Sequence, residues 1–543
     1  MKIRSIFSLM LAGAALGMSA QTQSDAVQYY KADQFENAKE LLQRNMNAPG
    51  ANQAENNYYL GLISLRDGKS SEALAFFNKG VEADPEFAYN YVGLASLELK
   101  NGDKKGAETL LKEADKRGKK DASLQVAIAR AYYDADPIAY AKEIEKYLDK
   151  ARKIDMEEAD IYLFEGDRKY DKKDWGGAAA QYEMGANYEQ EAVEAYVKYA
   201  NLFTQVNPQY AINMLNRLLQ LNPNSALAQR ELANAYYNNE NYNEAAKAYG
   251  EYVRNSNHFK QDEDRYAFLL FYGGDYQKGY DYATQLLQTN PSNFTAQRFQ
   301  FMNAAQLPAM KDRLLGMAEA LWKGHGPTPA TSLSVVDYNL ISEELSAAKR
   351  FEEAEAVLKE GIEKVPTNAD FNKRLAVVYV DENNLPAAAD AFAGYLSKLE
   401  KPNFNDFNQQ ATYSFYAGVQ TKADNPAASE KFFEDALKYA GLAQQELPSN
   451  YRPKKLAGDV AMQRASKEAA SSVAAPFYEE AWGLLMASDD PTRYKNDAIT
   501  IYNYLGNYYL DQKNTAKAKE YFNNYRTFDP NNADYAKFVE SLK

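Results

Sequence analysis

The stretch Tyr502-Asn503-Tyr504-Leu505-Gly506-Asn507-Tyr508-Tyr509 decides the fold, together with Ala518, Phe522 and Pro530 further along the chain. Here a small residue is followed after twelve positions by an alanine, and after four more by an aromatic ring. This spacing is typical of two antiparallel helices in close contact, because small residues let the backbones approach and the ring fills the remaining gap. Proline then ends the second helix, since it lacks an N–H and clashes with the preceding turn.

The same spacing recurs at five other places along the chain. It is found at Gly61/Ala73/Phe77, Gly166/Ala178/Tyr182, Ala233/Ala245/Tyr249, Ser342/Ala354/Leu358 and Ala376/Ala388/Phe392, with Pro85 and Pro366 closing two of the five. A period near 34 residues indicates stacked helix pairs that share one continuous core. The sequence therefore predicts an all-α helical-repeat fold.

This pattern resembles the signature of the tetratricopeptide repeat family, which is W-x2-L-G-x2-Y, then A-x3-F, then P. Residues 502–530 match it with Tyr502 in place of Trp, and residues 59–85 match nearly as well, although Ser64 replaces the usual Tyr. The resemblance implies a tetratricopeptide-type solenoid, a right-handed superhelix of about fourteen helix pairs that covers most of the chain after about residue 24. It also implies a scaffold or adaptor that binds a partner protein or an extended peptide in its concave groove, and not an enzyme.

The first twenty residues are typical of a secretory signal peptide. Lys2 and Arg4 are basic, residues 6–16 are apolar, and the small residues Ser19 and Ala20 precede Gln21. This arrangement predicts cleavage before Gln21. The chain has no cysteine, so it holds no disulfide and no lipid-bearing cysteine. We therefore expect a periplasmic protein, which could lie at the periphery of the outer membrane.

The charge balance restricts the classes of partner. Loss of Lys2 and Arg4 leaves 60 basic against 75 acidic residues, a net charge of −15. Nucleic-acid binding depends on Lys and Arg that displace counterions, so an acidic chain disfavours it. After residue 20 the sequence holds no apolar run long enough to span a bilayer, so direct membrane insertion is not expected.

One segment differs in composition from the rest. Residues 324–334 hold the densest cluster of Gly, Pro, Thr and Ser, which predicts a linker. We therefore expect a signal peptide at 1–20, an N-terminal array at 21–323, the linker, a C-terminal array at 335–534 and a capping helix at 535–543, which would cover the last apolar face.

Few residues offer catalytic or metal chemistry. His258 and His325 are the only histidines, and the absence of cysteine excludes a thiol nucleophile and zinc sites rich in nitrogen and sulfur ligands. Acidic clusters such as residues 262–264 lack the alternating ligands and glycine turn of calcium loops. No catalytic residue, metal or cofactor is therefore expected.

Tyrosine is the outlier of the composition, with 43 residues against 25 Phe and 3 Trp. We expect Tyr58, Tyr133, Tyr170 and Tyr237 on the inner face of the first helices of their pairs, where a large ring with a polar tip suits recognition. Use of tyrosine as a core residue that tolerates polar neighbours is the alternative.

Arg230, Asn234 and Tyr237 are spaced to share one helix face. In peptide-binding tetratricopeptide domains that grip a C-terminal carboxylate, a basic residue and an asparagine stand four apart in this way. The resemblance is partial, because the family's next asparagine is replaced by Arg265 or a residue near it. The alternative function is a glycan-binding or glycan-handling protein at the outer membrane, against which stand the missing lipid-anchor cysteine and the scarcity of Trp.

Overall fold

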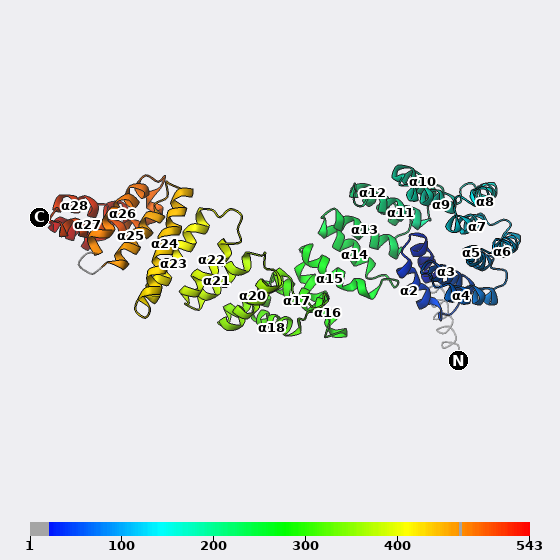
Figure 1. Ribbon diagram of the computed structural model, residues 1–543, viewed down its shortest axis with the longest axis horizontal. Helices are drawn as coiled ribbons and strands as arrows, with labels where there is room; N and C mark the ends of the chain where they lie inside the picture. The colour runs from blue at the N-terminus through cyan, green and yellow to red at the C-terminus, as the bar shows by residue number, and fades with distance from the viewer. Residues whose placement is uncertain (1–20, 466–469, 543) are drawn as a thin grey trace, which may run out of the picture. The chain divides into compact units, whose positions relative to one another are not determined.

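The computed structural model describes residues 21–465 and 470–542, and every regular element in these ranges is a helix. Within each of its two compact units, successive helices pack as antiparallel pairs, and neighbouring pairs pack on each other (Figure 1). The predicted all-α helical-repeat solenoid is therefore confirmed. No helix in the described ranges combines the length and apolarity needed to cross a bilayer. The predicted signal peptide at 1–20 lies outside the described residues.

The chain divides into two compact units, one that ends at Gln306 (unit 1) and one that begins at Leu307 (unit 2). In unit 1, residues 21–31 are helical and precede a regular series of helices, with η marking 3-10 helices. The series is α2 (Phe35–Asn45), α3 (Gln53–Arg66), α4 (Ser70–Ala83), α5 (Tyr89–Asn101), α6 (Lys104–Arg117), α7 (Ala122–Ala135), α8 (Ala141–Ile154), α9 (Ala159–Asp171), α10 (Trp175–Tyr188), α11 (Val193–Phe203), α12 (Pro208–Leu221), α13 (Ala226–Asn238), α14 (Tyr242–Tyr252), η1 (Lys260–Asp262), α15 (Glu263–Tyr272), α16 (Tyr276–Thr289) and α17 (Phe294–Ala304).

Unit 2 continues the pairwise arrangement with longer helices in its middle. Its elements are η2 (Pro308–Arg313), α18 (Leu314–Gly324), α19 (Val335–Ala347), α20 (Phe351–Lys364), α21 (Asp370–Asp381), α22 (Leu385–Leu396), α23 (Phe404–Thr421), α24 (Pro426–Glu446), α25 (Arg452–Arg464), α26 (Ala470–Met486), η3 (Pro491–Tyr494), α27 (Lys495–Asp511), α28 (Thr515–Phe522), α29 (Tyr525–Phe528) and α30 (Ala533–Ser541). In α30, Phe538 packs 5.3 Å from the ring of Phe522, so this helix covers the last apolar face.

The small residues of the repeat are needed where an aromatic ring wedges between helices. The ring of Phe77 on α4 contacts both Gly61 on α3 and Gly93 on α5, and a Cβ built at either glycine would lie within 2.4 Å of that ring. Any larger residue at these two positions would force the helices apart. One ring thus joins a helix pair to the next pair, which explains the spacing found in the sequence.

The predicted linker at 324–334 lies within unit 2. Residues 325–334 are indeed outside any helix and mostly exposed. However, α18 and α19, on either side of this loop, pack against each other and belong to the same compact unit. The irregular loop therefore interrupts the helical pattern without interrupting the packing of α18 on α19.

Candidate functional site

Arg230, the predicted binding cation, is already engaged within the chain. Its Nε donates to Asp262 at 2.7 Å, and one terminal nitrogen lies 3.3 Å from Gln34 Oε1. Burial opposes the charge, but the hydrogen bond and attraction of Asp262 outweigh it and raise the pKa of Arg230. Asn234, one turn further along α13, donates to Glu231 at 3.2 Å. Both side chains therefore make contacts within the chain in this structure.

The predicted tyrosines outside α13 do not gather at one place. Tyr58 is 5% exposed and packs between Tyr59 and Tyr89, and burial raises its pKa, so it is a core residue and not part of a surface. Tyr133 is half-buried and donates to Asp171 at 2.9 Å, and burial with this bond raises its pKa to about 12. Tyr170 is exposed and meets Trp175 edge to face at 4.9 Å.

The structure does bring Tyr237 and Arg265 together. The guanidinium carbon of Arg265 lies 5.2 Å from the centre of the Tyr237 ring, within the range of a cation–π contact. Tyr237 also contacts Tyr242 at 5.6 Å and Phe268 at 6.0 Å between ring centres. Tyr237 and Arg265 therefore lie in a group of aromatic rings.

We call this group the aromatic surface, and it consists of Tyr237, Tyr242, Phe268, Phe271 and Tyr272 with Arg265. Tyr272 is the most accessible member, 47% exposed, and the others are half-buried. Its ring lies 4.5 Å from Phe268, 5.1 Å from Phe271 and 6.0 Å from Tyr242. The rings thus form an unbroken chain across α13, α14 and α15.

Helix geometry explains why these rings meet. Phe268 and Tyr272 stand four apart on α15 and therefore lie on one face. Below them, Phe299 of α17 is buried and lies 5.8 Å from Phe268. Sequence reasoning missed Tyr242, Phe268, Phe271 and Tyr272, although the dense aromatic run at 266–272 was a visible signal.

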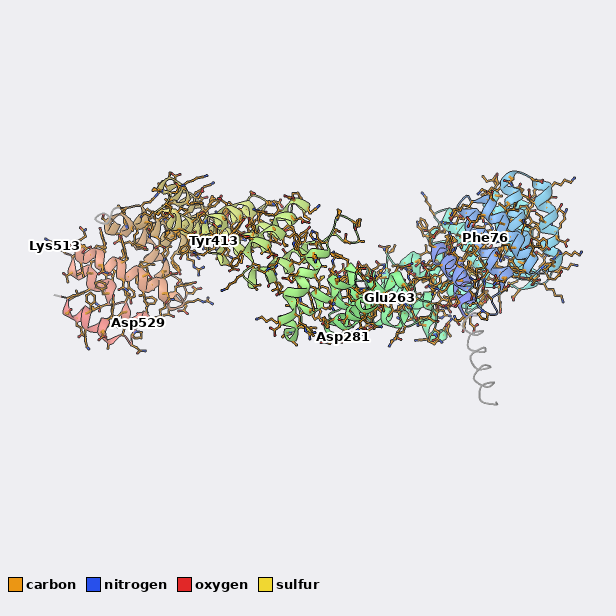
Figure 2. All side chains as sticks on the ribbon, turned by 90° about the horizontal axis from the view of Figure 1, so that it is seen from below. Phe76, Glu263, Asp281, Tyr413, Lys513 and Asp529 are labelled. Carbon is orange, nitrogen blue, oxygen red and sulfur yellow. The ribbon has the colours of Figure 1, made fainter. Side chains whose placement is uncertain are left out.

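The two histidines serve local packing. His258 Nδ1 lies 2.7 Å from the carbonyl oxygen of Asn255, which accepts, and Nε2 lies 3.0 Å from a carboxylate oxygen of Glu263, whose side chain is labelled in Figure 2. His325 stacks on Trp322 at 4.2 Å and lies 3.2 Å from Glu360. Among the described residues, no group of three or more His, Asp or Glu side chains could hold a metal ion.

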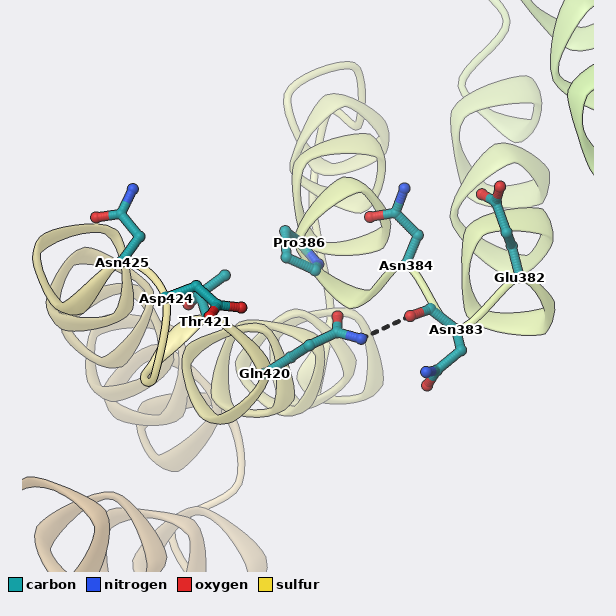
Figure 3. A pocket seen from close by; sticks show the side chains of 8 residues that line it. All are labelled: Glu382, Asn383, Asn384, Pro386, Gln420, Thr421, Asp424 and Asn425. Atoms are coloured by element: carbon teal, nitrogen blue, oxygen red, sulfur yellow. Dashed lines mark hydrogen bonds between the residues drawn. The ribbon is translucent and has the colours of Figure 1, made fainter.

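A shallow pocket of about 340 Å³ lies between two inter-helix turns of unit 2 (Figure 3). Gln420 points across it and donates to the carbonyl of Asn383 at 2.7 Å, while its oxygen accepts from the backbone of Leu385 at 2.9 Å. The side-chain amide of Gln420 therefore links the two turns by hydrogen bonds. The carboxylates of Glu382 and Asp424 are exposed at its rim. The pocket is thus a junction between repeats.

Two segments of the chain match sequence profiles of the tetratricopeptide repeat, at residues 201–258 and 345–405. These two segments are similar to the tetratricopeptide repeat. The first matched segment includes α13 and α14, and so it carries Tyr237 and Tyr242 of the aromatic surface. Tetratricopeptide repeats are generally protein-interaction scaffolds and not enzymes. No curated protein matches this sequence.

Several solved structures are similar to the chain. The C-terminal part of a TPR repeat-containing protein from Cytophaga hutchinsonii is 15% identical, covering 50% of this chain and 98% of that chain with a TM-score of 0.40. Yeast Tom70 is 14% identical, with 97% and 99% covered and a TM-score of 0.28. Cut9–Hcn1 of the APC/C is 12% identical, with 90% and 89% covered and a TM-score of 0.24.

Proposed function

We propose that this protein is an exported periplasmic scaffold that binds another protein through the aromatic surface of unit 1. The observation that carries the proposal is the unbroken chain of five rings around exposed Tyr272, bordered by Arg265. Tyrosine and arginine are enriched among the residues that dominate binding energy at protein interfaces. Large rings also give contact area at low entropy cost, which suits a binding surface.

The surface favours a partner segment that combines apolar groups with negative charge. The rings supply apolar contact, and Arg265 supplies a cation beside them. A carboxylate that accepts from Arg265 would gain a charge-assisted hydrogen bond. The partner is therefore expected to present an acidic, apolar segment.

The proposed location rests on the charged start, the apolar run and the small residues before Gln21. Fractionation of the native host should place the protein in the periplasm, with an N-terminus within a few residues of Gln21. A cytoplasmic product that retains Met1 would contradict the location and the class of partner.

The binding test compares two double variants of the full mature chain. Tyr242→Ala with Tyr272→Ala removes two rings of the aromatic surface, while Tyr188→Ala with Tyr210→Ala removes two exposed rings elsewhere in unit 1, 44% and 53% exposed. Proteins captured from a cell-envelope extract are quantified by mass spectrometry. We expect the first variant to lose at least one captured protein by about tenfold or more, equivalent to about 1.4 kcal/mol of binding free energy.

Helicity and melting temperature of both variants serve as controls for folding. Equal recovery of every captured protein by the two variants and the unaltered chain would contradict the proposal. Binding of a saccharide on a glycan array that depends on Tyr242 and Tyr272, with no protein captured, would contradict it in favour of a glycan-handling role.

A further inference from the structure

The N-terminal helix pair, residues 21–46, contacts parts of unit 1 that lie far away in the sequence. The first pair of a repeat array needs to touch only the second pair. Here Asp25 accepts from Asn257 at 2.6 Å, and the ring of Tyr29 lies 5.3 Å from Phe259. Figure 1 shows this blue segment beside α13. These contacts join residues more than 200 positions apart.

Charged groups of this pair meet opposite charges on the first helices of later pairs. Lys31 lies 2.8 Å from Asp160 on α9 and 3.5 Å from Glu194 on α11. Asp33 accepts from Lys198 on α11 at 2.5 Å. The N-terminal pair therefore places its charged side chains next to side chains of opposite charge on α9 and α11.

Gln34 of the N-terminal pair also makes polar contacts with α13. Gln34 donates to Glu231 at 2.7 Å and accepts from Arg230 at 3.3 Å. We call the surface made by Asp160, Glu194, Lys198, Arg230 and Glu231 the inner face of unit 1. Its residues come from three successive pairs, α9, α11 and α13, so the N-terminal pair lies across the array.

Several side chains at the contact between residues 21–46 and the inner face are buried. Tyr29 is fully buried, Asp25 is buried, and the side chain of Lys198 is 6% exposed between Asp33 and Asp167. On the inner face, Asp160, Glu194 and Lys198 are paired and their side chains are 16%, 8% and 6% exposed, while their partners Lys31 and Asp33 are 28% and 62% exposed. A buried charge that loses its partner is strongly unfavourable. The inner face thus has the features of a binding site that is already occupied.

We propose that residues 21–46 are a built-in ligand of unit 1, which occupies the inner face and must leave before any other helix can bind there. The chemistry of a competing partner follows from the contacts of this segment. It is an amphipathic helix that carries an aromatic ring and a basic residue spaced as Tyr29 and Lys31, followed by a turn with an acidic residue in the place of Asp33. The inner face and the aromatic surface share no residue, and the inference goes beyond the proposed function.

The test uses a fluorescent synthetic peptide of residues 21–46 and the full mature chain. Lys31→Glu places a negative charge against Asp160 and Glu194 and weakens the resident segment, whereas the peptide keeps Lys31. Gln43→Glu, an exposed position on the same segment, is the matched control. Fluorescence anisotropy should show that Lys31→Glu binds the peptide at least tenfold more tightly than the unaltered chain and the control.

A variant in which residues 21–46 are cross-linked to the rest of unit 1 should not bind the peptide. Because the chain has no cysteine, Arg44→Cys with His258→Cys provides only two thiols, at positions that now touch through Arg44 and the carbonyl of His258 at 3.5 Å. A short bis-maleimide should join them within one chain and abolish peptide binding. Equal peptide binding by the locked, control and Lys31→Glu proteins would overturn the proposal. A cross-linked dimer would overturn the assignment of the ligand to the same chain.

Hydrogen exchange of the unaltered chain tests the proposal without a substitution. Residues 21–46 should exchange as one group, faster than α9, α11 and α13, because a ligand can detach while its site stays folded. Exchange of the segment only together with those three helices would overturn the proposal, since it would make the segment an inseparable part of the fold. Neither result depends on the aromatic surface.

Discussion

One residue in each of nine helix pairs adopts a left-handed backbone conformation, always seven positions after the small residue of the repeat. These residues are Asp33, Gly68, Gly102, Lys173, Glu240, Gly274, Lys349, Asn383 and Lys513. A positive φ reverses the chain direction within a short turn and is rare outside glycine. Only three of the nine are glycine, so the turn geometry of the repeat overrides local preference at the other six.

Gly68 and Gly441 offer a clean test of this turn, because a Cβ at either position meets no other atom within 4 Å. Gly68 has φ of 78°, so Gly68→Ala is expected to destabilise unit 1 by about 1–2 kcal/mol through the backbone alone. Gly441 lies inside α24, where Gly441→Ala is expected to stabilise by about 0.5–1 kcal/mol. Thermal or urea unfolding measures both. Shifts of the same sign would contradict the assigned backbone geometry.

Ala245 tests the close approach of helices. It is fully buried on α14, so Ala245→Leu overpacks the contact with α13 and should cost about 1–3 kcal/mol. Because each repeat contacts its neighbours, hydrogen exchange should rise mainly in α13–α16. Uniform loss of protection over the whole of unit 1 would contradict repeat-by-repeat packing.

At the scale of single residues, the sequence predicted the residues that pack between helices far better than the residues that form surfaces. The small positions, such as Gly61 and Ala245, follow from a spacing that local helix geometry imposes. Arg230 could not be assigned in the same way, because its partners Asp262 and Gln34 lie 32 and 196 residues away. The place of Tyr58 in the core likewise depends on contacts with the next pair.

At the scale of elements, the helix boundaries could largely be predicted. The sequence predicts long helices at about 405–421 and 426–445, and the structure has α23 (Phe404–Thr421) and α24 (Pro426–Glu446) there. Proline and asparagine at the ends explain this agreement, since both α23 and α24 begin after an Asn cap. The contact between residues 21–46 and α9–α13 was not predicted, because repeat periodicity carries information only about neighbouring pairs.

The charge pairs of the N-terminal segment predict how its attachment depends on pH. Burial alone would raise the pKa of Asp160, but Lys31 and Ser123 outweigh it and bring the pKa below its ordinary value of 3.8. Burial likewise opposes ionisation of Asp167, and Lys198 with Arg130 lowers its pKa. A carboxylate whose folded-state pKa is lowered stabilises the fold above its ordinary pKa, and this contribution is lost as pH falls below it.

We therefore expect residues 21–46 to stay attached between pH 7 and about 4 and to loosen only below that range. Burial raises the pKa of Glu194, so this weaker partner of Lys31 is protonated first, while Asp160 still holds the lysine. Hydrogen exchange at several pH values, corrected for intrinsic rates, measures the attachment. Release of the segment between pH 7 and 5 would contradict the dominance of Asp160.

At the scale of the whole molecule, the two compact units and the exposed loop at 325–334 set where the chain can be cut. The loop holds Pro327 and Pro329 and lies outside any helix. His325, the first residue of the loop, is fixed in place because its ring stacks on that of Trp322. Limited proteolysis is expected to cut within 327–333 first and to give fragments of about 300 and 210 residues that remain helical. First cuts inside 160–290 would contradict this expectation.

The most direct test of the proposed protein-binding role is site-specific photo-crosslinking in living cells. A benzophenone amino acid replaces Tyr272 in the aromatic surface, or Tyr210, a tyrosine of similar exposure on α12, as the control. We predict that irradiation joins position 272, and not position 210, to one protein of discrete mass. The absence of an adduct at 272, or the same adducts at both positions, would contradict the account.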